Sequence, residues 1–348
     1  MKFYQQLQLN QAGSKKLIRQ TEQKGLKLQR ILIYILKVIL TVAFCFFVVS
    51  AFSLIFGNNN SIVGVVVLLF ILVMRKAHLG INTSHSILIL FSIFAILAIG
   101  PHLANMLSPL GAFAVNLFCI FTIVLIGCHE IQMSNQSTFV LSYLLLYGYD
   151  VSGHAFTLRI YGIILGAILT AVVFYINHRR TEFECTGSDI FRQFSLTSER
   201  NMWQMRFSLI VCTLMLILDI MGFHRIMWAG IAAMSILTPF PNNSHARLKW
   251  RAPGNIIGCV LFVLMFLFLP DNVFAMIGVF SGICIGFSAQ YSWQTIFNSL
   301  GALYIASGLF GVPTAIFLRI FHNTVGSLFS ALSDKALRVL SNKFLQVQ

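Results

Sequence analysis

The chain has 348 residues, of which 57% are hydrophobic and only 10% are charged, and its mean hydropathy is +0.83. A soluble domain averages about 25% charged residues, so this composition excludes a soluble globular protein and indicates that lipid covers most of the surface. The net charge of +14 does not indicate a nucleic-acid partner, because the basic residues fall between apolar segments, where they set topology and contact anionic lipid headgroups.

The N-terminal tail, residues 1–30, is polar and basic, and Glu22 is its one acid. It lacks the apolar core of a cleavable signal peptide, so we expect the first apolar segment to act as an uncleaved signal anchor. The tail either forms a helix on the membrane surface or is disordered, because its apolar periodicity is weak.

Twelve apolar segments follow, six on each side of a polar gap. They cover residues 31–56, 61–75, 86–100, 108–127, 136–148, 157–178, 204–222, 226–240, 253–270, 272–288, 295–310 and 313–333. Several are shorter than the roughly 20 residues that cross a bilayer unaided, so short, tilted or broken helices are expected among them. The sequence therefore predicts an all-α polytopic membrane protein with about 12 transmembrane helices.

The positions of the lysines and arginines predict the orientation. When the gaps between segments are assigned to alternate sides, 19 of the 24 basic residues lie on the side of the N-terminal tail and one, Arg225, lies on the other. Basic residues are retained in the cytoplasm, so both termini are expected there, with the protein in the cytoplasmic (inner) membrane.

The chain is expected to contain two similar halves of six helices. Arg159 and Gly162 open the sixth segment much as Arg319 opens the twelfth, and an even number of helices per half makes the repeat parallel. The predicted organisation is a cytoplasmic tail (1–30), a first membrane half (31–178), a cytoplasmic linker (179–203), a second membrane half (204–333) and a cytoplasmic C-terminal tail (334–348).

Arg-x-x-Gly-x-x-x-Gly occurs twice, at Arg159/Gly162/Gly166 and at Arg251/Gly254/Gly258. Glycines four residues apart share a helix face and let two helices approach closely, and the same role is expected of Gly326. The arginine one turn earlier either snorkels to the membrane edge or faces the bundle interior and holds an anionic substrate.

The second half resembles a known family. Trp228-Ala-Gly230, Thr238-Pro239, the Arg251 motif and the Arg319-x-x-x-Asn323-x-x-Gly326 helix are similar, in order and spacing, to the fusaric acid resistance and aromatic acid exporter family. The resemblance implies proton-linked efflux of small organic, often aromatic, acids. Asn255 and the His322-Asn323 pair depart from the residues common in the family.

Charged residues inside or beside the apolar segments are candidates for the transport site. The candidates for binding an organic anion are Arg251, Arg159, Arg319, Lys37 and Arg206. Asp219 is the preferred proton carrier, because burial can raise the pKa of a carboxylate, although it could instead be an interfacial acid beside His224 or Arg225. Glu130 could gate protons or be a solvated loop acid.

Other functions fit less well. No metal-binding spacing, nucleotide-binding loop or hydrolase motif is present and the seven cysteines form no C-x-x-C pair, so we expect no enzyme, metal or cofactor. The expected partners are membrane lipids, a small organic anion and protons, with a homo-oligomer as an option and no nucleic acid. Two alternatives stay open: a non-transporting scaffold of an envelope-assembly system, and, ranked last, a transferase acting on lipid-linked substrates.

Overall fold

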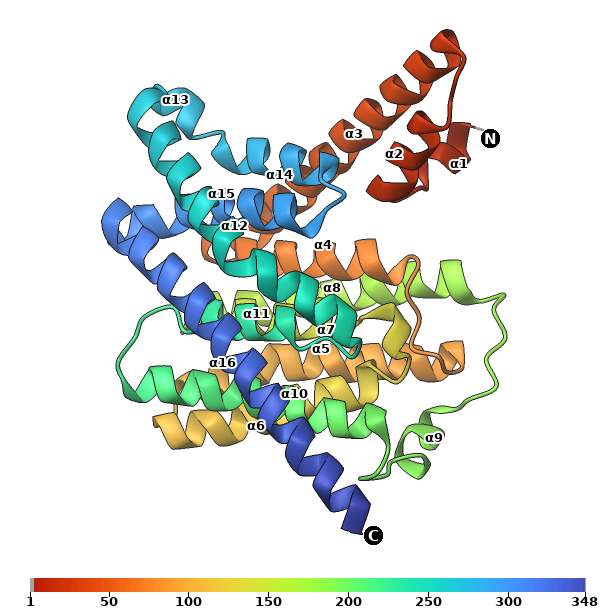
Figure 1. Ribbon diagram of the computed structural model, residues 1–348, viewed down its shortest axis with the longest axis vertical. Coiled ribbons are helices and arrows are strands. Elements are labelled where there is room, and N and C mark those ends of the chain that lie inside the picture. The colour runs from red at the N-terminus through yellow and green to blue at the C-terminus, as the bar shows by residue number, and fades with distance from the viewer. Residues whose placement is uncertain (1–2, 348) are drawn as a thin grey trace. The chain divides into compact units, whose positions relative to one another are not determined.

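The computed structural model describes residues 3–347, and within that range the chain is built of helices without a strand (Figure 1). Helix accounts for 82% of it, which confirms the predicted all-α class. Seven helices are long and apolar enough to cross a membrane, and three shorter apolar helices accompany them. A polytopic membrane protein is therefore supported, whereas the predicted count of 12 transmembrane helices in two repeats is not confirmed.

The contacts divide the chain into two compact units. Unit 1 contains residues 1–47 and 249–323, and unit 2 contains residues 48–248 and 324–348. Both units draw on both predicted halves, so the units and the halves are different divisions. The predicted boundaries of the halves and of the linker therefore stay a prediction, as does the placement of residues 1, 2 and 348, which lie outside the described residues.

Unit 1 begins with a folded N-terminal segment. It contains α1 (Phe3–Leu7), α2 (Gln11–Arg19) and the start of α3 (Lys24–Phe56). The side chain of Asn10 caps α2 by accepting from the amide of Gly13 at 2.7 Å. Arg30 of α3 donates to the carbonyl oxygen of Leu17 and to the hydroxyl of Thr21. The N-terminal segment is therefore helical at α2 and is tied to the first long helix, while its position on the membrane surface stays a prediction.

The remainder of unit 1 comes from the second half of the sequence. It comprises the greater part of α12 (Pro241–Phe268), α13 (Asp271–Phe274), α14 (Ile277–Phe287), α15 (Tyr291–Phe310) and the start of α16 (Val312–Val347). Gly254 and Gly258 lie against α15, and a Cβ on Gly258 would lie 2.6 Å from the carbonyl oxygen of Ile296. Only glycine permits this approach, so the glycine pair fixes the contact between α12 and α15.

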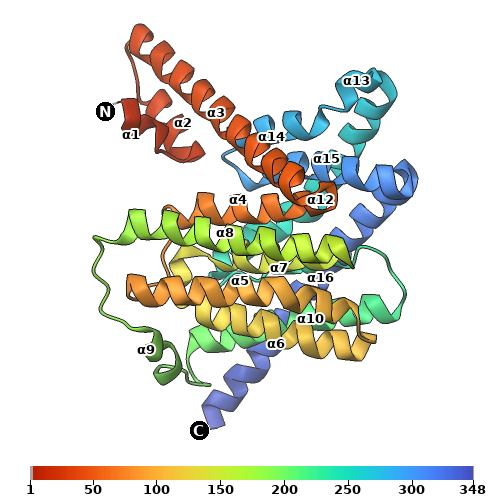
Figure 2. The same ribbon diagram turned by 180° about the vertical axis from the view of Figure 1, so that it is seen from behind.

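Unit 2 contains most of the long apolar helices. Its elements are the end of α3, η1 (Asn58–Asn60), α4 (Ser61–Met74), α5 (Thr83–Asn105), α6 (Pro109–Gly127), η2 (Ile131–Met133), α7 (Gln136–Gly148), α8 (His154–His178), α9 (Gly187–Arg192), α10 (Glu199–Ile220), α11 (Met227–Ile236) and the last part of α16. Helix α8 packs on α4 and α5, and α6 packs on α5 and α10, as seen from behind in Figure 2.

Two glycines in unit 2 make comparable contacts. Gly166 of α8 lies against Val67 of α4, and Gly326 of α16 lies against Ala229 of α11. In both pairs the last apolar segment of a predicted half packs on the second segment of that half. This correspondence favours the predicted repeat, which stays a prediction because no second observation tests it.

Eleven of the twelve predicted segments coincide with one helix each, and the segment 272–288 is divided between α13 and α14. Three helices extend beyond their apolar segments by more than five residues: α3 begins at Lys24, α12 begins at Pro241 and α16 ends at Val347. Hydropathy locates the part of a helix that lipid can cover, while polar helix formers such as Lys, Arg and Gln continue the helix beyond it.

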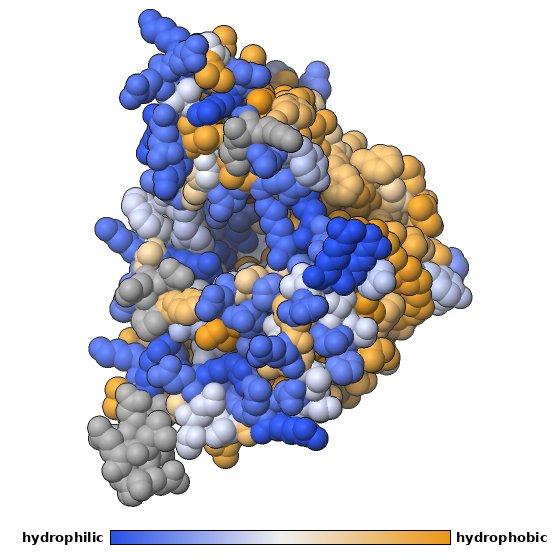
Figure 3. Space-filling view, turned by 90° about the vertical axis from the view of Figure 1, so that its right-hand side faces the viewer, coloured by the Kyte–Doolittle hydropathy of each residue, from blue (hydrophilic) through white to orange (hydrophobic). Residues whose placement is uncertain are grey.

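One face of the molecule is rich in hydrophilic side chains, while hydrophobic side chains gather at one margin of the same view (Figure 3). Helix α9 lies on this side of the ribbon (Figure 1). The linker around α9 is attached to its neighbours: the amide of Asn82 donates to the carbonyl oxygen of Cys185 at 2.8 Å, and the amide of Gly187 donates to His85 Nδ1 at 3.1 Å.

Candidate functional site

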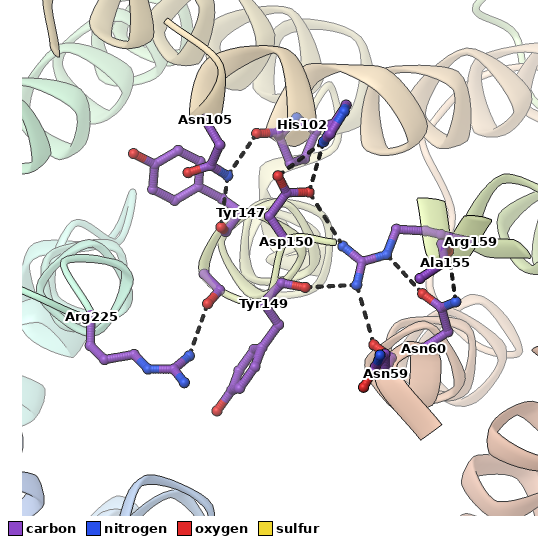
Figure 4. A network of polar contacts seen from close by, with 12 residues as sticks. Asn59, Asn60, His102, Asn105, Tyr147, Tyr149, Asp150, Ala155, Arg159 and Arg225 are labelled. Atoms are coloured by element: carbon purple, nitrogen blue, oxygen red, sulfur yellow. Dashed lines mark hydrogen bonds and ion pairs between the residues drawn. The ribbon is translucent and has the colours of Figure 1, made fainter. Parts of the chain in front are cut away.

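Arg159 lies in a network of polar contacts in unit 2 (Figure 4). Its side chain is 2% exposed. The Nε atom donates to Asn60 Oδ1 at 3.0 Å, and Nη2 donates to the carbonyl oxygen of Tyr149 at 2.6 Å. Asp150 Oδ1 lies 3.7 Å from Nη1 and supplies the opposite charge. The guanidinium thus has a carboxylate, a side-chain amide and a main-chain carbonyl around it.

The side chains of the same network contact polar groups at the ends of several helices. Asn60 donates from Nδ2 to the carbonyl oxygens of Phe56 and Ala155, both at 2.9 Å. His102 at the end of α5 lies 2.9 Å from Asp150 Oδ2. The carbonyls of Phe56 and Tyr149, at the ends of α3 and α7, need partners when water is excluded, and Asn60 and Arg159 supply them. The geometry around Arg159 is that of a structural joint between the ends of α3, α5, α7 and α8.

Arg251 occupies a second buried polar cluster, in unit 1. The residue is 8% exposed and lies ten residues after Pro241, the first residue of α12. The Nε atom donates to Asn323 Oδ1 of α16 at 3.0 Å, and Nη1 donates to the hydroxyl of Tyr291, the first residue of α15, at 3.2 Å. Both of these partners are neutral, so Arg251 brings a positive charge into the place where three helices meet.

Neutral hydrogen bonds continue the cluster from Arg251. Asn255 donates from Nδ2 to the carbonyl oxygen of Arg251 at 2.7 Å and accepts from the hydroxyl of Ser299 at 2.8 Å. Asn323 donates from Nδ2 to the carbonyl oxygen of Arg319 at 2.8 Å. Since Asn255, Ser299 and Asn323 are at most 1% exposed, the amide and hydroxyl groups of α12, α15 and α16 hold one another in place.

The charge balance of unit 1 distinguishes its cluster from that around Arg159. Arg319, one turn before Asn323 on α16, is 7% exposed. The acids of unit 1 are Glu22 and Asp271, and no carboxylate of residues 3–347 forms an ion pair with Arg251. A buried guanidinium that no carboxylate neutralises is energetically costly, which marks Arg251 as a candidate for binding an anion. The arrangement can bind a carboxylate by charge-assisted hydrogen bonds.

Lys37 and Arg206, two further predicted anion-binding residues, have other partners. Lys37 donates from Nζ to the carbonyl oxygen of Leu9 at 3.1 Å and to the hydroxyl of Ser14 at 2.6 Å. Arg206 lies with its Nε 3.3 Å from Asp334 Oδ1. Lys37 thus attaches the N-terminal segment, and Arg206 joins α10 to α16. A role for either in substrate binding stays a prediction.

Asp219 and Glu130, the predicted proton-coupling residues, lie in different places. Asp219 is half-buried and is the last residue but one of α10, near the end of that helix. Among residues 3–347 its carboxylate has no hydrogen-bond or ion-pair partner, so the alternative of pairing with His224 or Arg225 is not seen. Glu130 caps η2 by accepting from the amide of Gln132 at 3.2 Å.

His129 joins Glu130 to the linker. Its Nε2 lies 3.2 Å from Gln193 Oε1. Burial lowers the pKa of His129 and Arg200 lowers it further, while Gln193, Glu130 and Asp189 act in the opposite direction. No group of three histidine, cysteine or acidic side chains within residues 3–347 is placed to hold a metal ion.

The predicted helix-packing glycines all lie against neighbouring helices. In addition to Gly254, Gly258, Gly166 and Gly326, a Cβ on Gly162 would lie 3.3 Å from the rings and methyl groups of Phe56 and Val63. The sequence reasoning did not include Tyr291, Thr295 and Ser299 of α15. Their spacing of four residues, on one face of an otherwise apolar helix, is the signal that could have identified them.

Residues 210–333 match the family model described as fusaric acid resistance protein-like. The predicted resemblance is thereby confirmed for this part of the chain, which includes Arg251, Tyr291, Arg319 and Asn323 but not Arg159. No curated protein and no solved structure matches the chain significantly. The family match indicates a role in membrane transport and is consistent with a protein that is not an enzyme.

Proposed function

We propose that the protein is a secondary transporter that exports small organic acids, aromatic acids in particular, across the cytoplasmic membrane with protons as the coupling ion. Buried Arg251, whose side-chain partners are neutral, is the observation that carries the proposal. The family match over residues 210–333 supports the transport role.

Arg251 and Arg319 are the proposed anion-binding residues. A carboxylate that arrives at Arg251 would replace a neutral partner with an opposite charge, and charge-assisted hydrogen bonds contribute about twice as much as neutral ones. Release of the bound anion then requires that a second group change its charge by taking up or losing a proton. Asp219 is the proposed proton carrier, because its carboxylate is half-buried and has no ion-pair partner among residues 3–347. The proposed orientation places both termini in the cytoplasm.

The test is transport by the full chain in proteoliposomes. A panel of aromatic and aliphatic carboxylates is loaded on one side, with and without a pH gradient, and their flux is measured. We expect Arg251→Gln to raise the half-saturating concentration of the transported acid by about tenfold or more, since one charged hydrogen bond contributes about 1.5–3 kcal/mol. Arg251→Lys retains the charge and should retain part of the affinity.

Asp219→Asn tests the coupling. We expect it to abolish the response to a pH gradient while the protein still inserts in normal amounts. Val260→Asn, at an exposed position of α12, serves as a control for introducing an amide into a helix face. If Arg251→Gln and Asp219→Asn transport every acid of the panel as the unaltered protein does, the proposal is wrong.

A further inference from the structure

Unit 2 contains a large apolar groove that the transport proposal does not use. Its volume is about 1030 Å³, and it is formed by α6, by the start of α10 with the residues before it, and by the last part of α16. Phe113, Leu117 and Phe121 line it from α6, Met205 and Leu209 from α10, and Leu337 from α16. This volume is at the upper end of the range for small-molecule sites, about 300–1,000 Å³.

The groove runs along two helices that are candidate membrane spans, α6 and α10. These helices are antiparallel neighbours, because Gln204 near the start of α10 donates from Nε2 to the carbonyl oxygen of Val124 near the end of α6 at 3.1 Å. The groove therefore extends from the polar start of α10 toward Phe113, near the start of α6. Its lining is almost wholly apolar, which suits an occupant that is soluble in a bilayer.

Basic side chains mark one end of the groove. Arg206 lines it, and its Nε lies 3.3 Å from Asp334 Oδ1. Arg338 lies 2.7 Å from the other oxygen of the same carboxylate. Glu199 also acts on Arg206 electrostatically, so two guanidinium groups and two carboxylates gather at this end of the groove. The terminal nitrogens of Arg206 donate to no residue of the part of the chain that the structure describes.

We propose that this groove binds one anionic phospholipid, with an acyl chain along α6 and α10 and the phosphate at Arg206. The terminal nitrogens of Arg206 supply donors from which a lipid phosphate can accept, and arginine is well suited to bind a phosphate. The site is separate from the Arg251 cluster, because it is formed by unit 2 alone.

The proposal is tested with the purified full chain by native mass spectrometry, using phosphatidylglycerol and phosphatidylcholine with identical acyl chains. We expect one phosphatidylglycerol per chain to be retained at least fivefold more strongly than phosphatidylcholine. Arg206→Gln should remove this preference, since a basic residue at the membrane surface changes anionic lipid binding by roughly fivefold. Ala114→Trp, at an exposed alanine of the groove, should reduce binding of both lipids by at least fivefold.

Ala43→Trp, at an exposed alanine of α3 in unit 1, is the matched control and should leave lipid binding unchanged. A phosphatidylglycerol with a photoreactive acyl chain should label peptides of α6 and α10 and lose that labelling in Ala114→Trp. Equal binding of the two lipids by the unaltered protein, or labelling that Ala114→Trp does not change, would overturn the proposal. So would cross-links showing that a second copy of the chain fills the groove.

Discussion

Arg159 and Arg251 begin the same sequence motif, and both donate from Nε to a buried asparagine at 3.0 Å, yet their surroundings differ. Arg159 also faces Asp150 and the carbonyl oxygen of Tyr149, so its charge is compensated where helices end. Arg251 has Asn323 and Tyr291, which are neutral. The comparison teaches that a motif places an arginine on a helix, while the acids contributed by other segments decide whether the charge is available to a ligand.

The largest effect is expected from Arg159→Gln. Removing one member of a buried ion pair typically lowers the free energy of unfolding by about 3–5 kcal/mol, and since Asp150 is partly exposed we expect a loss toward the lower end of this range. Arg251→Gln should cost less than about 1 kcal/mol, since it removes a charge that no carboxylate within residues 3–347 compensates. Reversible unfolding in mixed micelles measures both. Equal losses of stability would remove the distinction between the two clusters.

The glycine contacts give the next largest difference. Gly258→Ala places a methyl group 2.6 Å from the carbonyl oxygen of Ile296, so overpacking should lower the stability by about 1–3 kcal/mol. Gly162→Ala meets its nearest atoms at 3.3 Å and should cost less than about 1 kcal/mol. The same unfolding measurement compares them, and a larger loss for Gly162→Ala would contradict the packing that these distances indicate.

A smaller effect is expected from Tyr291→Phe. The substitution removes the hydroxyl that accepts from Arg251 and keeps the ring, so Arg251 should become less well oriented for an anion. We expect the half-saturating concentration of the transported acid to rise two- to fivefold, which corresponds to a hydrogen bond of about 0.5–1 kcal/mol. Tyr149→Phe is a matched control, because Tyr149 contacts Arg159 through its main-chain carbonyl.

The smallest effect concerns His129 and pH. Burial lowers the pKa of His129 in the folded protein, so the unfolded loop binds the proton more tightly. Attachment of the linker is then complete above the unfolded pKa of about 6.5 and weakens as the pH falls below it. Hydrogen exchange of residues 187–193, corrected for intrinsic rates, should increase between pH 7.5 and 5.5, and His129→Gln should flatten that change. An equal increase in both proteins would exclude His129 as the cause.

The sequence predicted the helices well because lipid demands long apolar segments, and it missed the ends of α3, α12 and α16 because polar residues extend a helix beyond the membrane. For the candidate site, it identified Arg251 and Arg319 as rare charges in apolar surroundings. It could not identify Tyr291 or Asp334 as partners, since those contacts join segments far apart in the chain. The sequence also could not show that the surroundings of Arg159 and Arg251 differ. Asp150, the acid beside Arg159, lies in a loop outside the shared motif.

The contacts of Lys37 bear on how the protein enters the membrane. Lys37 lies inside the first long helix and donates to the carbonyl oxygen of Leu9 and the hydroxyl of Ser14. A lysine at the centre of an inserting helix costs about 2.5–3.5 kcal/mol. A chain that lacks its first twenty residues would lose these two acceptors, and its first helix should insert less efficiently or at a shifted depth. We therefore expect the N-terminal segment to contribute to membrane insertion as well as to the folded state.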